Sequence, residues 1–178
     1  SDVYKRQLSY YSVPELVKQE KAFLESEDMY HPMLENPVAN TIKEERGVLV
    51  TGSNASGKST FLKTVAISAV FAQTIHTCPA RQYRACYFQI YSSMALKDNL
   101  QGNESYYIVE IKSLKRILNR VEEKTPLLCF VDEVLRGTNT IERISASAQI
   151  LKSLAKVHVM CFAATHDIES VSYTHLTL

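Results

Sequence analysis

The sequence predicts an α/β fold in which helices flank a mostly parallel core sheet. Three apolar runs, at 48–50, 127–131 and 157–164, of which only the last contains a polar residue (His158), are typical of strands buried on both faces. Segments with the apolar spacing of helices alternate with these runs, which favours parallel strands joined by helical connections. A glycine-containing turn at 52–57 joins the first run to such a helix. The 178 residues are enough for one domain of this kind.

The remaining elements follow from local patterns. We expect a helix at 13–27, because Pro14 suits a first helical position and an imperfect apolar stripe follows it. Residues 82–92 alternate with a period of two and predict one strand, whose aromatic face we interpret as packing in a sheet–helix layer rather than stacking on bases. The other expected elements are a loop with a short extended segment at 29–42, a strand at 47–52, a largely apolar helix at 58–77, a polar loop at 93–104, and helices at 105–122 and 141–156.

Composition excludes several classes of protein. The formal net charge of +1 gives no electrostatic reason to expect nucleic acid or a membrane as a direct partner. The four cysteines show no C-x-x-C spacing, so we expect buried, reduced thiols in a cytoplasmic protein. No secretory signal and no bilayer-spanning apolar run is visible.

The turn between the first strand and its helix fits the P-loop pattern G-x-x-x-x-G-K-[ST]. The matching residues are Gly52, Ser53, Asn54, Ala55, Ser56, Gly57, Lys58 and Ser59. Such a loop directs backbone amides and a helix N-terminus at phosphates, while Lys58 reaches the β- and γ-phosphates and Ser59 ligates Mg²⁺. The alternative is a chance match, which the strand before the turn and the helix after it disfavour. We therefore predict a nucleoside triphosphate site.

Two carboxylates follow the apolar strand at 127–131. We expect this strand to lie beside the P-loop strand, so that Asp132 comes close to the Mg²⁺ and Glu133 orients the attacking water as general base. The alternative is a solvated strand end, which the P-loop upstream disfavours. His166 follows the third apolar run, where strand ends converge on a nucleotide, and it can donate a hydrogen bond to a γ-phosphate oxygen.

Five segments share one further pattern: HPMLENPVANTI at 31–42, TGSNASGKST at 51–60, SYYIVEI at 105–111, DEVLRGTNT at 132–140 and ATHD at 164–167. In order and approximate spacing they resemble the ATPase domain of the MutS family of DNA mismatch-repair proteins. The DE-x-x-RGT run within the fourth segment is much more specific than a P-loop alone. The resemblance covers about 28–168.

The resemblance implies an ABC-type P-loop ATPase fold that works as a head-to-head homodimer with ATP and Mg²⁺. It implies that Lys58, Glu133 and His166 are catalytic, and that Ser59 and Asp132 serve the metal. Thr60 joins the phosphate-binding residues, Val38 and Asn40 line the adenine side, and Ser105 reaches the partner's nucleotide. ATP binding closes such dimers and hydrolysis reopens them, which moves DNA-clamping segments in domains outside this chain.

The sequence departs from the family pattern at several positions. Ala55 and Ser56 replace Met-Gly, Leu135 replaces a glycine, and Asn139 replaces a serine, which suggests a divergent MutS-related subfamily. We expect non-native read-through at 1–7, a helix from a preceding domain at 8–27, the MutS-like ATPase domain at 28–170, and non-native read-through at 171–178. The two read-through segments are left out of the expected fold. A membrane contact is expected only if a full-length protein has a spanning N-terminal region.

Three other functions are compatible with parts of the pattern. A transporter or SMC-like ABC module carries an LSGGQ-like signature, which nothing here matches. A nucleotide-gated dimerisation module would not need the pair formed by Glu133 and His166. A nucleoside kinase would need a phosphoacceptor site and a lid segment, and neither is visible.

Overall fold

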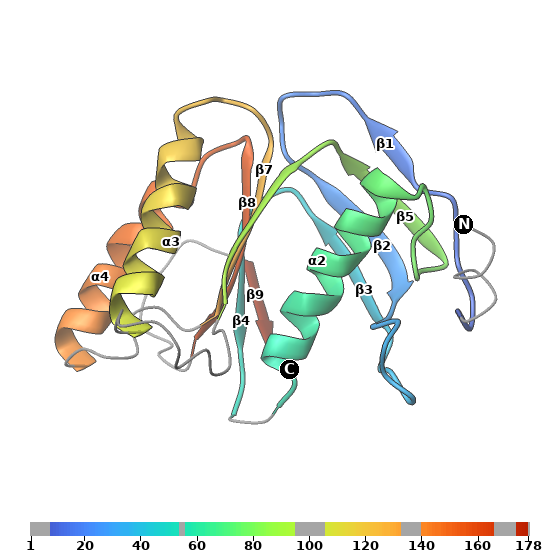
Figure 1. Ribbon diagram of the computed structural model, residues 1–178, viewed down its shortest axis with the longest axis horizontal. Helices are drawn as coiled ribbons and strands as arrows, with labels where there is room; N and C mark the ends of the chain where they lie inside the picture. Colours follow the sequence, from blue (N-terminus) through green and yellow to red (C-terminus); the bar gives the residue numbers. More distant parts are fainter. Residues whose placement is uncertain (1–7, 54–55, 95–105, 133–139, 166–173, 178) are drawn as a thin grey trace.

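The computed structural model describes residues 8–53, 56–94, 106–132, 140–165 and 174–177, which form two sheets and three helices (Figure 1). In chain order the elements are β1 (Glu15–Val17), β2 (Leu24–Met29), β3 (Asn40–Glu44), β4 (Val48–Thr51), α2 (Lys58–Thr74), β5 (Gln82–Cys86), β6 (Gln89–Ser93), α3 (Tyr106–Val121), β7 (Leu127–Asp132), α4 (Thr140–Leu154), β8 (Val159–Thr165) and β9 (Thr174–Thr177).

The main sheet is parallel throughout, which confirms the expected α/β class. Its strand order is β6-β7-β8-β4-β9, and each neighbouring pair is parallel. The expectation that β7 lies beside β4 was wrong, because β8 lies between them. Parallel strands still end at one edge of the sheet, since Asp132 is in register with Ala164, and Thr51 is in register with Thr165.

The two faces of the main sheet are buried against different helices. In β7, Leu128 and Phe130 belong to a core cluster with α2, whereas Leu127, Cys129 and Val131 belong to a second cluster with α3 and α4. Successive side chains of a strand point to opposite faces, so a strand between two helical layers must be apolar at every position. This explains the continuous apolar runs in the sequence.

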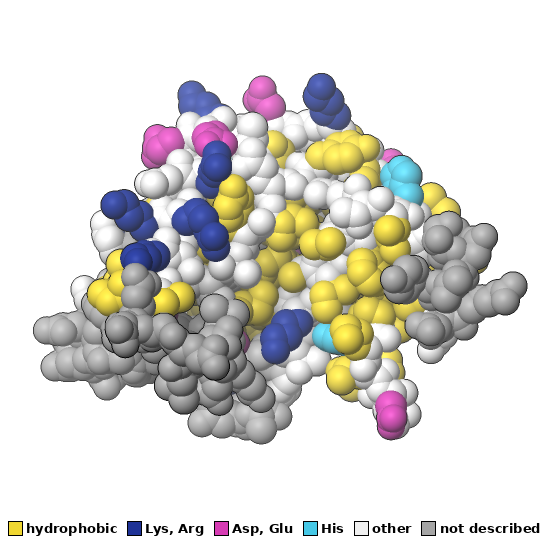
Figure 2. All heavy atoms as spheres, viewed as in Figure 1, with side chains coloured by type: hydrophobic (Ala, Val, Ile, Leu, Met, Phe, Trp, Pro, Cys, Tyr) yellow, Lys and Arg dark blue, Asp and Glu magenta, His cyan; other side chains and the backbone are white. Residues whose placement is uncertain are grey.

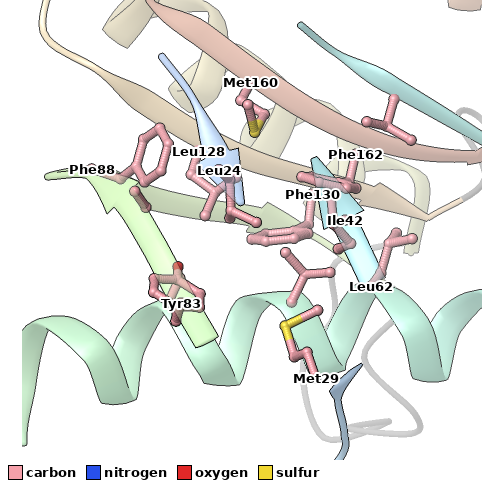
Figure 3. Close-up of a cluster of buried hydrophobic side chains, with 14 of the residues drawn as sticks. Leu24, Met29, Ile42, Leu62, Tyr83, Phe88, Leu128, Phe130, Met160 and Phe162 are labelled. Atoms are coloured by element: carbon pink, nitrogen blue, oxygen red, sulfur yellow. The ribbon is translucent and has the colours of Figure 1, made fainter. Parts of the chain in front are cut away.

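α2 lies between the main sheet and a second sheet. Its buried residues include Phe61, Leu62 and Val65, which share a cluster with side chains of β2, β7 and β8. Phe162 of β8 stacks on Phe130 of β7, with ring centroids 5.8 Å apart, on the side that faces the helix (Figure 3). A helix covered on two sides needs apolar residues around most of its circumference, as the sequence indicated.

The second sheet replaces the helix expected at 13–27. Its order is β1-β5-β2-β3, with β2 antiparallel to both neighbours. In β2, Leu24, Ser26 and Met29 are buried, and Ser26 donates a hydrogen bond to the Gln82 carbonyl oxygen at 3.1 Å. The prediction was wrong because a buried serine hides the strand alternation, and pairing with β5 overrides local helix preference.

The single strand expected at 82–92 is two strands in different sheets. β5 belongs to the second sheet and β6 to the main sheet, and the chain crosses between them at Tyr87 and Phe88. Gln73 of α2 holds this crossing: its amide donates to the Phe88 carbonyl oxygen at 3.0 Å and accepts from the Phe88 amide at 2.7 Å. Tyr83 is buried as expected, but Tyr87 is half-exposed because the break turns it outward.

Most other expectations are confirmed. The predicted helices at 58–77, 105–122 and 141–156 correspond to α2, α3 and α4, and the cysteines are free and buried. Most of the predicted loop at 93–104 lies outside the described residues. β9, within the segment that we left out of the fold, pairs with β4, and the origin of residues 171–178 stays a prediction. In the described part of the chain, no helix is both long and apolar enough to span a membrane.

Candidate phosphate and metal site

The turn from β4 into α2 has the backbone conformation that its glycine allows. Gly57 stands at the N-cap of α2 with φ of +93°, a left-handed conformation that side chains with a Cβ rarely adopt. Its carbonyl oxygen accepts the first helical hydrogen bond, from the Phe61 amide at 2.8 Å. The amide of Ser56 donates to the Ser53 carbonyl oxygen at 3.2 Å, which closes the turn. The loop therefore leads directly into the start of the helix.

Lys58 begins α2 and folds back over this loop. Its ammonium donates to the carbonyl oxygens of Gly52 at 2.7 Å and Ser53 at 2.8 Å, and the residue is only 6% exposed. An ammonium has three donors and no acceptor, so it suits a position between loop carbonyls and an anion. The structure thus places the cation of the P-loop pattern at the mouth of the loop.

Ser59 and Asp132 meet although 73 positions separate them in the sequence. Asp132 shares the face of β7 that carries Leu128 and Phe130, so its side chain turns toward α2. The Ser59 hydroxyl, one residue into that helix, donates to Asp132 Oδ2 at 2.6 Å. This distance falls in the range of hydrogen bonds to an ionised carboxylate. Asp132 is 8% exposed, so it is a nearly buried carboxylate with a neighbouring hydroxyl.

The N-terminus of α2 is suited to an anion. No side chain caps it, and its first turn contains no acidic residue. Its first amides carry partial positive charge without a helical acceptor, and a phosphate can satisfy them. The Ser56 hydroxyl oxygen is buried in the same loop and has no hydrogen-bond partner among the described residues. The residues present therefore fit a phosphate group.

The same residues fit Mg²⁺ better than a metal held by protein alone. Within the described ranges, no group of three or more His, Cys, Asp or Glu side chains could hold a metal ion. Mg²⁺ is usually bound by one or two protein oxygens and completes its shell with waters and substrate phosphates. The Ser59 hydroxyl and the Asp132 carboxylate are hard oxygen donors of this kind.

Three other predicted site residues, Val38, Asn40 and Thr60, make hydrogen bonds that do not involve Ser59 or Asp132. Asn40 begins β3 and donates to the Val38 carbonyl oxygen at 3.1 Å, and Val38 is 79% exposed. Within the described part of the chain, this pair makes no hydrogen bond to the loop. Thr60 is exposed, and its carbonyl oxygen accepts from Thr64 at 2.8 Å. The predictions for Asn54, Ala55, Ser105, Glu133 and His166 concern residues outside those described.

Sequence reasoning passed over one polar residue at this edge. Thr51 closes β4, is 5% exposed and stands level with Thr165 of β8. The sequence did contain a signal for Thr51. It is the polar residue that ends an apolar strand, directly before the first glycine of the P-loop pattern, so it must lie beside the loop.

Comparison with known proteins decides the family. The model for the family described as MutS domain V matches residues 48–177, which contain every element from β4 to β9. The chain belongs to the MutS family. It is 35% identical over 150 residues to MutS protein homolog 4 of Mus musculus, covering 79% of this chain and 15% of that protein.

Two bacterial relatives give the same result. The chain is 34% identical over 147 residues to the DNA mismatch repair protein MutS of Thermotoga sp. (strain RQ2), which covers 78% of this chain and 18% of that protein. It is 32% identical over 168 residues to the protein of the same name from Pelotomaculum thermopropionicum, covering 88% and 19%. The chain thus spans less than a fifth of the length of these MutS relatives.

Proposed function

We propose that this chain is the ATP-binding and ATP-hydrolysing domain of a MutS-like protein, with an ABC-type P-loop fold. The observation that carries the proposal is the contact between Ser59 and Asp132, because it joins the P-loop helix to the strand that ends in Asp132-Glu133. A hydroxyl and a carboxylate 2.6 Å apart beside an uncapped helix N-terminus form the expected surroundings of a metal-bound triphosphate.

In this proposal each residue has one role. The amides of the 52–57 loop and of the start of α2 bind phosphate oxygens, and Lys58 turns from the loop carbonyls toward the β- and γ-phosphates. Ser59 and Asp132 hold Mg²⁺, which neutralises developing charge on the phosphate oxygens. Glu133 orients and polarises the attacking water, and His166 donates to the γ-phosphate. Val38 and Asn40 lie on the adenine side, where the high exposure of Val38 leaves an apolar surface open.

We further propose that the domain acts as a homodimer in which Ser105 completes the partner's site. ATP would favour the closed dimer and hydrolysis would release it, because ATP has a higher affinity for the closed state. The cycle would drive DNA clamping through other domains, in mismatch repair or related DNA processing. Identities near one third, together with Leu135 and Asn139, support a divergent subfamily.

Steady-state ATP hydrolysis tests this function. The purified chain is assayed over a range of concentrations with Mg²⁺, beside Glu133→Gln, which keeps side-chain size and removes the base. We expect specific activity that rises with protein concentration and is lost in Glu133→Gln, while ATP binding is retained. Activity that is independent of concentration would refute the role of Ser105, and equal activity in Glu133→Gln would refute the proposed base.

A further inference from the structure

The side of α3 that faces solvent is strongly cationic. Leu114, Ile117 and Val121 recur at intervals of three and four residues and are buried against the main sheet. The basic residues of the helix lie on the opposite side of its circumference, at 112, 115, 116 and 120. We call Lys112, Lys115, Arg116 and Arg120 the α3 cationic face. Figure 2 shows basic side chains gathered over this part of the molecule.

The net charge of the whole chain does not reveal the local charge of α3. α3 carries these four cations and one carboxylate, Glu110, which gives a charge of +3, whereas the whole chain carries +1. Glu110 is half-buried, and its Oε2 is shielded from solvent. Lys112, Lys115 and Arg116 are exposed, and Arg120 is partly exposed beside Glu123. The neutral average charge therefore does not describe this face.

Two of the cations are held in place by an aromatic ring. The guanidinium groups of Arg116 and Arg120 lie 5.7 Å and 5.8 Å from the centroid of the Tyr91 ring. Tyr91 belongs to β6 and packs against the core cluster under α3. Cation–π contacts of this kind orient a guanidinium while its edge can still donate hydrogen bonds, and Arg120 already donates one from Nη1 to the Glu123 carboxylate. The face is thus partly ordered before any ligand arrives.

The spacing of the face suits a polyanion with regularly spaced charges. Lys112, Arg116 and Arg120 are four residues apart, so they form a row with steps of about 6 Å along the helix. Duplex DNA carries one phosphate charge per about 1.7 Å of axis, and a row of this length can contact several phosphates. We propose that the α3 cationic face binds the phosphate backbone of duplex DNA without sequence preference. The choice of DNA among polyanions rests on the proposed function.

One feature of the helix favours a different ligand. Ile108 and Ile111, near the N-terminal end of α3, are 42% and 37% exposed, and an apolar surface beside cations would also suit an acidic protein segment. Both isoleucines lie in the N-terminal half of α3, beside Lys112, whereas Arg116 and Arg120 lie in the C-terminal half, where the Tyr91 ring orients them. The row of cations continues beyond the isoleucines to Arg120, so DNA is the ligand we propose, and an acidic protein segment is the competing outcome of the test.

The test measures binding of a fluorescently labelled DNA duplex to the purified chain, without nucleotide, over a salt range of about 50–200 mM. With four phosphates contacted, the plot of log affinity against log salt should have a slope of about −3.6. The double variant Lys112→Gln/Lys115→Gln should bind more weakly, with a slope smaller by about 1.8. The control double variant Lys18→Gln/Lys43→Gln removes two exposed lysines from the second-sheet side and should match the wild type.

Three results would overturn the proposal. They are no duplex binding by the wild type at low salt, an equal loss in the control double variant, and equally tight binding of polyglutamate, which would assign the face to acidic protein. All four lysines are exposed, so thermal unfolding should confirm that both variants are folded. ATP binding is measured separately on the same preparations. DNA binding without ATP binding would refute the ATPase assignment alone, and the reverse result would refute the DNA proposal alone.

Discussion

The hydrogen bond between Ser59 and Asp132 should be measurable in the free protein. The changes are Ser59→Ala, Asp132→Ala and the double variant, which together form a thermodynamic cycle. The 2.6 Å distance and the 8% exposure of Asp132 indicate a charge-assisted bond in a place that water reaches poorly. Hydrogen bonds to charged groups contribute about 1.5–3 kcal/mol. We expect Ser59→Ala alone to lower the free energy of unfolding by about 2 kcal/mol, because it leaves the carboxylate without this donor.

The cycle isolates that interaction from the other effects of each substitution. In the Asp132→Ala background, Ser59→Ala should cost much less, so the coupling free energy should be about 1.5 kcal/mol. Urea unfolding in EDTA without nucleotide gives all four free energies of unfolding. Ser53→Ala is the matched control, since its side chain is exposed on the same loop, and it should change stability by less than about 0.5 kcal/mol. A coupling below about 0.5 kcal/mol would refute the reasoning, because the two groups would then not interact in solution.

Two further predictions concern the backbone near α2. Gly57 has φ of +93°, and nothing lies within contact of the position where a Cβ would be. Gly57→Ala should therefore lower the free energy of unfolding, measured in urea, by about 1–2 kcal/mol, the cost of holding alanine in a left-handed conformation, and Gly57→Asn should lower it less. Equal stability of the three proteins would contradict this prediction. Gln73→Ala leaves the Phe88 amide and carbonyl without these partners and should lower the free energy of unfolding by about 2 kcal/mol. Gln73→Glu keeps the acceptor, so its stability should lie between those of the wild type and Gln73→Ala. An unchanged thermal midpoint in Gln73→Ala would show that these two hydrogen bonds do not hold the crossing.

The C-terminal two thirds of the fold could be predicted from sequence because its signals are local. The strands β4, β7 and β8 are apolar at nearly every position, and only a strand between two layers requires this. The helices show the matching stripes, as Leu114, Ile117 and Val121 do in α3. The N-terminal part could not be predicted because its structure depends on distant residues, as in β2, where Ser26 pairs with Tyr83 of β5.

The crossing from β5 to β6 shows the same limit. No glycine or proline marks the break at Tyr87 and Phe88, and it depends on hydrogen bonds from Gln73 on another element. At the candidate site, the sequence motifs predicted that Lys58, Ser59 and Asp132 lie close together. Side chains alternate along β7, so Asp132 points to the same side as Leu128 and Phe130, toward α2. The sequence did not indicate that β8 lies between β4 and β7, because strand order depends on connections rather than on local pattern.

The central claim is that the loop at 52–57, Lys58, Ser59 and Asp132 hold Mg²⁺-bound ATP. Calorimetric titration of ATP into the purified chain tests it most directly, with Mg²⁺ and with EDTA, beside Lys58→Ala and Asp132→Asn. We predict saturable binding that weakens in EDTA, is lost in Lys58→Ala, and becomes nearly independent of Mg²⁺ in Asp132→Asn. Equal ATP affinity in the wild type and Lys58→Ala, or an affinity that EDTA leaves unchanged in the wild type, would contradict the account.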